Sequence, residues 1–544
     1  MEELAPLEPF GECYDVFSQL ENSQNETAEK VAQCKRLARD IKSKRATRGN
    51  LPADIHRSFP SRQVMDELVE LYFATFESCF RILYLPSFRA DYESYTNQPE
   101  TAKDHFLLRL LLVMILAGTI HDDSNVRNDM ATKSSSWIYI AQTWLSAPLE
   151  KNRLKVEGIQ IHCLLLLARQ VTRVGTDLVW ISAGSLTRMA MQMGFHQDPN
   201  RFEEMSTQQK EIRRRLWYTI LELNVQAALD SGMSPMIRDE DYNTQPPSNV
   251  NDNDLDEGNP EEHPTHVSFQ PVLASSLPLR LRVTRVINSL QEESSYEQVL
   301  AIGNELAQAC RDAATEIEHA ASMNKTAKFA SSYCSHLLRR FPLCLHFSYA
   351  ITAQKNPLYS YSQKVCLAAA QDIVSLLEDV LYRRLLLAGG GMFRDIITRG
   401  ALLIFLGLCP EPEGDISFFP GRDRNRKEPL LQDGRRVVQY AKDRMWYGET
   451  NVKVYVCLNM MLAQAESRLY GKPSKEAILK VLHESLDTCH ELFQTRSSTN
   501  PMDPGTETWP FGGMEMPLLA DFDTDFDFLG DSFDLGFSDS LFPQ

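Results

Sequence analysis

The chain has 544 residues, of which 43% are hydrophobic, and a formal net charge of −17. This length is enough to bury one large core or two ordinary ones, and a mean hydropathy of −0.31 is typical of a globular protein in water. The longest apolar run, residues 110–120, is too short to cross a bilayer, so we expect no membrane association. The net negative charge excludes a protein that coats nucleic acid by bulk electrostatics, and any DNA contact has to be local.

The eleven cysteines are scattered from Cys13 to Cys489, with no CxxC pair among them. Most lie in apolar helical contexts, which predicts reduced core thiols. No four-ligand set has the spacing of a structural zinc site, so we expect no cofactor and no bound metal. The acidic start, MEELAPLEPF, lacks the apolar core of a signal peptide and favours the cytosol or the nucleus.

Residues 1–58 are expected to form a disordered polar arm, acidic at first and basic from residue 35 to residue 48. Asp40 is the single acidic residue within this basic run. The run has two interpretations, a solvated linker or a segment for nuclear import or DNA-backbone contact. Its members are Lys35, Arg36, Arg39, Lys42, Lys44, Arg45 and Arg48. Val31, Leu37 and Ile41 have helical spacing, but three positions are too few to establish a coiled coil.

Apolar residues recur at helical spacing from Ser61 onward. The first stripe is Val64, Leu68, Leu71, Thr75 and Cys79, and neighbouring aromatic side chains widen it, which indicates a core and not a cofactor site. Further helical patterns lie at about 103–120, 135–146 and 156–173. No alternation of period two is sustained, so the sequence predicts an all-α fold with a first helical half over residues 59–250.

Two more helices are predicted in the middle of the chain. The first has an apolar stripe and stops near Gly194; its stripe is Leu178, Ile181, Leu186, Met189 and Met193. The second begins at a capping box of Ser206 and Gln209 and ends at Gly232, with Glu211 supporting Arg215 four residues on. The carboxylate-rich stretch that follows is expected to be an ordered loop.

This order of parts resembles the middle of the fungal-specific transcription factor domain, the middle homology region of zinc-cluster transcription factors. The residues that carry the resemblance are Met189, Ala190, Gly194, Phe195, His196, Arg213, Arg214, Trp217, Gly232, Asp239, Asp241 and Pro247. Residues 59–88 resemble the opening helix of the same domain. The resemblance implies a multi-helix regulatory domain that acts in the nucleus on transcription by RNA polymerase II, with pathway-specific control such as that of a secondary-metabolite gene cluster.

Members of that family usually carry an N-terminal cluster of six cysteines that holds two zinc ions and places a helix in the major groove. The first sixty residues here contain only Cys13 and Cys34, so the zinc module is absent from this chain. Three routes to DNA stay open: a homodimer or a heterodimer with a zinc-cluster protein, direct contact through the basic arm, or a module encoded upstream of Met1.

The second part of the chain is also predicted to be helical. Residues 239–262 carry nine acidic residues and no Lys or Arg, which predicts an exposed connection and an acidic linker over 251–274. A helical second half over 275–496 is expected to have helices at 283–320, 328–352, 364–387, 393–408, 431–446, 452–470 and 474–495. Arg339, Arg340, Arg383 and Arg384 are predicted on helix surfaces, and residues 411–427 in a surface loop.

The composition changes abruptly after Arg496, and residues 497–544 contain no Lys or Arg. Phenylalanines alternate with aspartates in this tail: Phe522, Phe526, Phe528, Phe533, Phe537 and Phe542. Repulsion among the aspartates keeps such a segment expanded, so that short pieces can fold onto a groove of a coactivator. We predict an acidic-aromatic activation tail that binds coactivator proteins.

Two other classes of function compete with a transcriptional regulator. An all-α metal-dependent enzyme is suggested by Asp122 and Asp123 after a helix, but Val126 replaces the third carboxylate, and no HExxH, GxSxG or P-loop motif occurs. His196 is interpreted as a partner of a helix end and not as a base. The stronger alternative is a helical scaffold that binds partners or an effector, and the tail favours a regulator over it.

Overall fold

The computed structural model describes residues 26–43, 51–52, 54–146, 154–202, 204–252, 254–257, 269–290, 295–322, 325–409, 420–470 and 473–499. Every regular element in these ranges is an α-helix or a 3-10 helix, and they contain no strand. The predicted all-α fold is confirmed. No helix in the described ranges combines the length and the apolarity needed to span a membrane.

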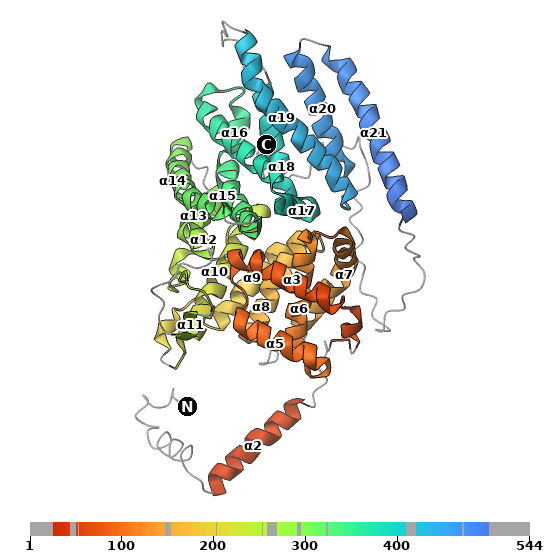
Figure 1. Ribbon diagram of the computed structural model, residues 1–544. Helices are drawn as coiled ribbons and strands as arrows, with labels where there is room; N and C mark the ends of the chain where they lie inside the picture. Colours follow the sequence, from red (N-terminus) through yellow and green to blue (C-terminus); the bar gives the residue numbers. More distant parts are fainter. Residues whose placement is uncertain are drawn as a thin grey trace.

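The first helical half forms the lower part of the body in Figure 1. Its helices are α3 (Arg62–Ala74), α4 (Phe76–Phe80), α5 (Leu85–Asn97), α6 (Asp104–Ile120), α7 (Ser124–Ser146), α8 (Val156–Thr172), α9 (Val179–Gln192) and α10 (Thr207–Asp230). Helix α6 is apolar on every side, and it is enclosed by α3, α7 and α8. A helix of this kind belongs in a core, so the longest apolar run of the sequence is the centre of this half.

The second half forms the upper part of the body in Figure 1. Its helices are α12 (Gln270–Ser275), α13 (Leu277–Ile287), α14 (Tyr296–Ala321), α15 (Lys325–Thr352), α16 (Ser360–Ser375), α17 (Val380–Ala388), α18 (Met392–Leu408), α19 (Pro420–Trp446), α20 (Val452–Leu469) and α21 (Ser474–Thr499). Helices α14, α15, α16, α18, α19, α20 and α21 pack in this order, each against the next. Short connections between helices favour this arrangement of sequence neighbours.

Three predicted boundaries in the second half are wrong. The segments 283–320 and 364–387 each contain two helices, since the chain leaves the helix after Ile287 and again at the 3-10 turn η9 (Leu376–Glu378). Residues 420–427, expected in a loop, are the start of α19, where Pro420 stands at the first position of the helix. Proline is tolerated there because the first helical N–H groups have no partner within the helix.

The buried face of α9 differs from the predicted stripe. Leu178 and Ile181 are 41% and 61% exposed, whereas Val179, Ala183 and Leu186 are buried. The helix begins one residue after Leu178, so the face that meets α8 and α10 is turned away from Ile181. Apolar residues lie on both the predicted face and the observed face of α9, and the packing of α9 against α8 and α10 decides which face is buried.

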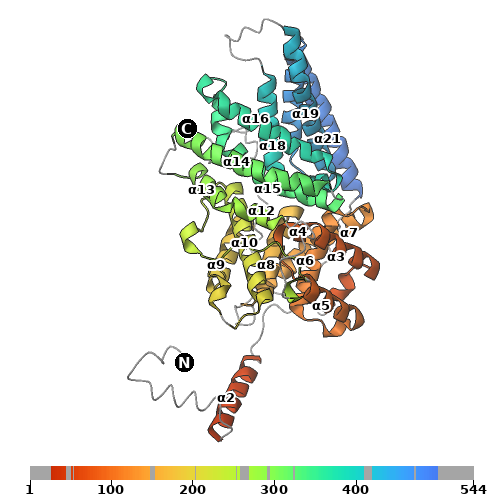
Figure 2. The ribbon, with the colours of Figure 1, turned by 60° about the vertical axis from the view of Figure 1, so that its left-hand side comes forward.

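Helix α2 (Glu26–Ser43) stands apart from the helical body in both Figure 1 and Figure 2. It contains the short apolar seam noted in the sequence, and two of the seam residues, Val31 and Leu37, are 38% and 62% exposed. Lys35 and Arg36 are exposed on the same helix. The described part of the N-terminal arm therefore presents a basic helix to solvent.

Candidate functional site

The junction of α9 and α10 collects most of the residues that carry the family resemblance. Gly194, with a φ of 75°, ends α9 in the left-handed conformation that favours glycine. Arg213 of α10 donates from Nη2 to the carbonyl oxygen of Met193 at 2.6 Å, and its guanidinium lies 4.2 Å from the centre of the buried Phe195 ring. Arg213 thus satisfies a carbonyl at the end of α9 that has no partner within the helix, and it joins α10 to that end.

Arg214, the next residue, points to a different neighbour because successive helical residues lie about 100° apart. It donates to both carboxylate oxygens of Asp198, at 3.2 and 3.3 Å. The backbone N–H groups of Asn200 and Gln245 donate to the same carboxylate. Burial acts to raise the pKa of Asp198, but these hydrogen bonds hold it below its ordinary value, so the carboxylate is charged and binds the loop after α10 to α10 itself.

That loop turns back on the helix pair. Gly232, with a φ of 64°, ends α10, and Thr244 donates from its hydroxyl to the carbonyl oxygen of Phe195 at 2.7 Å. The ring of Trp217, which is fully buried, lies edge-on to Tyr242. Asp239 and Asp241 are exposed in the 3-10 turn η7 (Asp239–Asp241), where the Asp241 carboxylate accepts from the N–H of Arg238 at 2.7 Å. The expected ordered loop is confirmed.

His196 makes a hydrogen bond through its backbone, and its ring lies beside that of Trp217, with the two ring centres 6.4 Å apart. Its carbonyl oxygen accepts from the N–H of Asn243 at 3.0 Å, whereas its Nδ1 has no hydrogen-bond partner among the described residues. The side chain that completes the end of α9 is Arg213, so the interpretation of the His196 ring as the cap partner is wrong. The Arg213 side chain is longer than that of His196 and reaches the carbonyl oxygen of Met193 from α10.

The third arginine of the run, Arg215, belongs to a buried ion-pair cluster that the sequence only partly indicated. It bonds to Glu211, as predicted from the i,i+4 spacing, at 3.1 Å. It also donates to Asp252 at 2.6 Å, and Arg81 reaches the same carboxylate at 2.5 Å. The other oxygen of Asp252 accepts from the N–H of Leu85. Buried charges persist only where they are paired in this way.

The position of Asp252 corrects the expected exposed connection. Asp252 is 7% exposed and Phe269 is 1% exposed, so the chain on both sides of residues 258–268 is packed on the body. Gln270 extends this contact, because its Nε2 donates to the carbonyl oxygens of Phe80 and Arg215. The domain boundaries at residues 250 and 275 stay a prediction, but the chain next to them does not lie free.

The C-terminal part of α10 binds the second half. Glu222 accepts two hydrogen bonds of 2.7 Å from Arg280 of α13, whose side chain has no exposed surface. Further along, Arg340 of α15 donates to Gln226 and to Asp230, at 2.7 and 2.8 Å. Both pairs link the halves by charge-assisted hydrogen bonds, which are stronger than neutral ones.

Arg340 is only 3% exposed, so its predicted place on a helix surface is wrong. The signal that could have found it is its register: Tyr333, Leu337, Arg340 and Cys344 follow one another at helical spacing, and the other three are apolar and buried. An arginine inside an apolar stripe needs a buried carboxylate. Asp230, 110 residues earlier, supplies it.

The carboxylates behind the enzyme hypothesis have structural partners. Asp122, which is exposed, binds Lys325 at 3.0 Å and Arg384 at 2.6 Å. Asp123 accepts from the N–H of Asn125 at the start of α7. Within the described residues no group of three or more His, Cys, Asp or Glu side chains could hold a metal ion.

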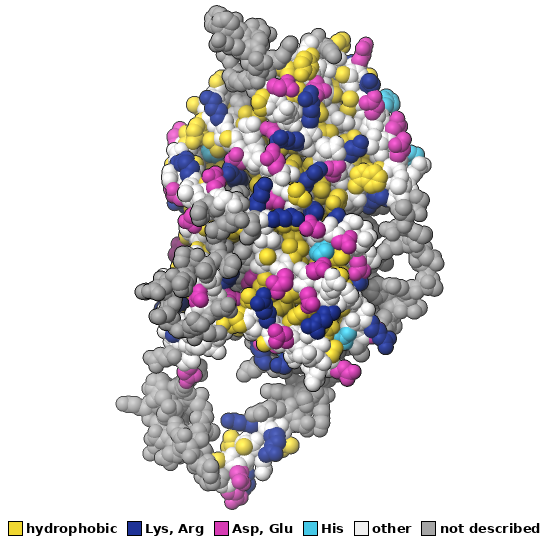
Figure 3. All heavy atoms as spheres, viewed as in Figure 1, with side chains coloured by type: hydrophobic (Ala, Val, Ile, Leu, Met, Phe, Trp, Pro, Cys, Tyr) yellow, Lys and Arg dark blue, Asp and Glu magenta, His cyan; other side chains and the backbone are white. Residues whose placement is uncertain are grey.

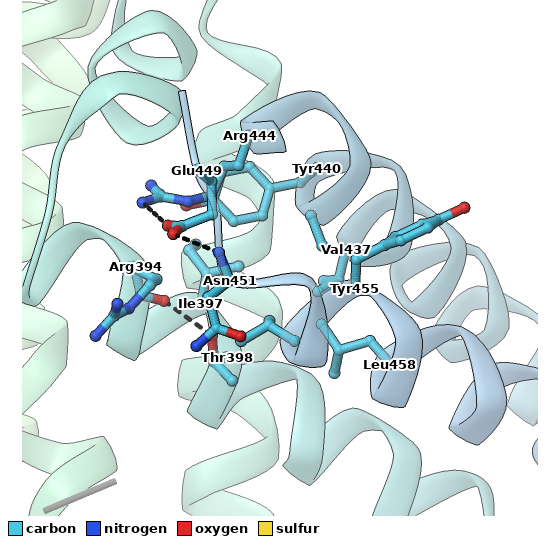
Figure 4. Close-up of a pocket in the computed structure, with 12 residues that line it drawn as sticks. Arg394, Ile397, Thr398, Val437, Tyr440, Arg444, Glu449, Asn451, Tyr455 and Leu458 are labelled. Carbon is cyan, nitrogen blue, oxygen red and sulfur yellow. Dashed lines mark hydrogen bonds and ion pairs between the residues drawn. The ribbon is translucent and has the colours of Figure 1, made fainter. Parts of the chain in front are cut away.

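A small pocket lies between α18, α19 and α20. Figure 4 shows Arg444 and Glu449 directed toward each other beside Tyr440, and the two charged groups are 3.1 Å apart. Arg444 also donates to the carbonyl oxygen of Leu386 at 2.6 Å. The cavity measures about 20 Å³, which holds a single water molecule and no metabolite. Its polar groups join the helices together.

A much larger cavity, of about 1160 Å³, lies where the lower half meets the ends of α19 and α21. One wall comes from the first half, with Met130 of α7 and Val171 of α8, and the other from Trp446, Phe493 and Arg496. We name it the interhalf groove. It exceeds the volume of most small-molecule sites, which is about 300–1,000 Å³.

The segments predicted to contact other macromolecules are described in part. Lys35 and Arg36 are exposed on α2, and Arg39 and Lys42 belong to the same helix. Lys44, Arg45 and Arg48 lie outside the described residues. So do Phe522 and the other tail phenylalanines, and their predicted roles stay predictions.

Comparison with known proteins identifies the family. A sequence model of the fungal specific transcription factor domain matches residues 69–337. The chain is 33% identical over 542 residues to "Transcription factor opdR" of Penicillium oxalicum, in an alignment that covers 93% of this chain and 68% of that protein. The chain belongs to the fungal-specific transcription factor domain family. The description of the family model and the name of this relative both indicate transcription factors.

Other members of the family are similar over most of this chain. "Transcription factor asR3" of Sarocladium schorii is 34% identical over 86% of the chain, and "Aspyridones cluster regulator apdR" of Emericella nidulans is 27% identical over 75%. The alignments cover 60% and 58% of these two relatives. The chain therefore spans about three fifths to two thirds of the length of the relatives it matches.

Proposed function

We propose that this protein is a pathway-specific transcriptional regulator, an activator of RNA polymerase II genes that acts in the nucleus on a secondary-metabolite gene cluster. The observation that carries the proposal is the membership of the fungal-specific transcription factor domain family. One relative is named as a cluster regulator, which favours control of a gene cluster. Activation rests on the composition of residues 497–544.

We assign a separate role to each of three parts of the chain: the helical body, the basic helix α2 and the C-terminal tail. The helical body is held together by α10, which binds the second half through buried ion pairs. The basic helix α2 supplies exposed Lys35 and Arg36 for nuclear import or for contact with DNA phosphates. The tail recruits coactivator proteins. DNA is reached through this arm, through a partner, as a homodimer or a heterodimer with a zinc-cluster protein, or through a module encoded upstream of Met1.

The tail provides the test. Fused to an unrelated DNA-binding domain, residues 497–544 should drive a reporter gene, because a peptide that folds on its coactivator does not need the helical body. Replacing Phe522, Phe526, Phe528, Phe533 and Phe537 with Ala should abolish the activity while leaving the charge unchanged, since buried aromatic side chains supply most of the binding energy in such complexes.

A matched variant separates charge from aromatic contact. Replacing the seven aspartates between residues 521 and 539 with Asn should weaken activation without abolishing it, because the attraction to basic groove rims disappears while the rings remain. A fusion that is expressed and nuclear but silent, or one that stays active without the five phenylalanines, would favour the helical scaffold over the activator.

A further inference from the structure

The interhalf groove is positively charged. The charged side chains among the described residues that line it are Arg127, Arg173 and Arg496, and none of the described lining residues is Asp or Glu. Arg127 donates from Nη1 to the carbonyl oxygens of His121 and Asp122, at 2.6 and 2.8 Å. These carbonyl groups orient the guanidinium without neutralising it, so its charge remains available to an anion in the groove.

Arg173 is held in a similar way. It donates from Nε to the carbonyl oxygen of Ala388 at 2.8 Å. Among the described residues, the carboxylate paired with it is that of Glu449, which lies 3.8 Å away and is shared with Arg444 at 3.1 Å. Burial lowers the pKa of Arg173 to about 10, which leaves the side chain charged at neutral pH. The single negative charge of Glu449 is therefore shared by the two positive charges of Arg173 and Arg444, which leaves a net positive charge beside the groove.

The groove also offers surface for aromatic rings. Trp446 and Tyr447, at its edge, are 55% and 41% exposed, whereas large aromatic side chains are usually mostly buried. Met130 and Val171 line the wall formed by the first half. A ligand that fits this groove carries both negative charge and aromatic groups.

A segment of this chain has that chemistry and begins at the groove. Phe493, Thr495 and Arg496, in the last turns of α21, line the cavity, and α21 ends at Thr499 beside the lower half of the body (Figures 1 and 2). Residues 500–544 follow directly. They contain ten Asp and Glu, eight aromatic residues and no Lys or Arg. Attachment at the rim gives such a segment an effective concentration in the millimolar range, so weak contacts are enough to hold it.

We propose that residues 500–544 dock in the interhalf groove, with their aspartates beside Arg127, Arg173 and Arg496 and their phenylalanines against the apolar wall and the exposed rings of the rim. Docking covers the rings that coactivators are proposed to bind, so the tail cannot occupy the groove and a coactivator at once. This consequence rests on the proposed function, whereas docking itself does not. The groove then acts as an intramolecular brake on the tail.

Cross-linking in the full chain tests the docking. A photoreactive benzoyl-phenylalanine at Thr132, which is exposed and lines the groove, should cross-link to peptides from 500–544. The same group at Leu358, which is 67% exposed and lies outside the groove, should not. At 1 M salt, where the Debye length is about 3 Å, most of the product should disappear. Equal products from both positions, or none from Thr132, would overturn the proposal.

Charge variants and isotope mixing complete this experiment. Arg127→Glu should remove most of the cross-link, while Arg282→Glu, at an exposed position on α13, should retain it. The folding of each variant is checked by its helical circular dichroism. If mixed ¹⁵N-labelled and unlabelled protein gives cross-links between two chains, the occupant is a second copy and the proposal is wrong.

The reporter assay separates the two proposals. With the full chain fused to an unrelated DNA-binding domain, Arg127→Glu should raise the output, whereas the detached tail, which lacks the groove, should already be at the higher level. A silent detached tail refutes the activator even where the cross-link forms. An active detached tail without the cross-link refutes the docking alone.

Discussion

At the scale of single residues, the distinctive feature of the protein is the number of ionisable side chains that its core contains. Glu77 is 4% exposed, and its carboxylate oxygens accept from the hydroxyl of Tyr72 and from the N–H of Leu83, both at 2.8 Å. Burial raises the pKa of Glu77 to about 8, and Arg81 and Tyr72 oppose this shift. The carboxyl group is therefore mostly protonated at neutral pH.

This shift makes a pH-dependent contribution to stability. Because the folded pKa lies above the unfolded value of 4.5, the contribution is complete below pH 4.5 and is lost as the pH rises toward 8. Glu77→Gln cannot ionise, so its unfolding free energy relative to the wild type should increase between about pH 5 and pH 8. Urea denaturation at both pH values measures this. Glu70→Gln, at an exposed position, is the control, and parallel curves for Glu77→Gln and the wild type would contradict the raised pKa.

A second prediction at this scale concerns the buried face of α10. Leu216 and Trp217 have no exposed surface. Replacing either with Ala should lower the unfolding free energy by about 2–5 kcal/mol, because a cavity remains where the large side chain packed. Leu358→Ala, at a position that is 67% exposed, should change it by less than about 0.5 kcal/mol. Denaturation midpoints of Leu216→Ala and Trp217→Ala equal to that of the wild type would show that α10 is not packed as described.

At the scale of elements, α10 is the helix on which both halves depend. It packs against α8 and α9 on one side and against α12 and α13 on the other. Its N-terminus is closed by the predicted capping box, in which the Ser206 hydroxyl accepts from the N–H of Gln209 and the Gln209 side chain accepts from the N–H of Ser206, both at 3.2 Å. This box is local, and it sets where the helix starts.

Removing the cap should weaken the whole body because both halves are bound to α10. Ser206→Ala should cost about 0.5–2 kcal/mol of unfolding free energy, whereas Ser206→Gly should cost only a few tenths. Thr207→Ala, at the next exposed position, serves as the control. Chemical denaturation followed by circular dichroism gives the three values, and an Ala variant as stable as the wild type would contradict a role for the hydroxyl.

At the scale of the whole molecule, charge decides how the protein meets DNA. Basic and acidic side chains are interspersed over the face of the body in Figure 3, and the chain as a whole is acidic. The basic run at residues 35–48 is the local exception, and Lys35 and Arg36 are exposed in it. We expect the chain to bind DNA weakly and without sequence preference, through bonds to phosphates.

Fluorescence anisotropy over a salt series tests this expectation. Changing Lys35, Arg36, Lys44 and Arg45 to Gln should reduce the salt slope by about one for each phosphate that the variant no longer binds. Arg282→Gln and Lys480→Gln, on the helical body, should leave the slope unchanged. Sequence-selective binding at nanomolar concentration and physiological salt would reveal a DNA-reading element other than this basic run.

The sequence by itself determined what depends on near neighbours in the chain. The helical period, the start of α10 at Ser206, its end at Gly232 and the bond from Arg215 to Glu211 all involve residues at most four positions apart, so they could be predicted. The acidic-aromatic composition of residues 497–544 could also be recognised from the sequence alone, because composition does not depend on the fold.

Only the tertiary structure decided which partners meet across long separations. Arg81 and Asp252 are 171 residues apart, and Arg340 and Asp230 are 110 apart, so no local pattern pairs them. The interhalf groove likewise needs α7, α8, α19 and α21 to be brought together. The physical reason is the same in each case: a buried charge or an apolar face requires a partner, but which distant segment supplies it depends on how the helices pack.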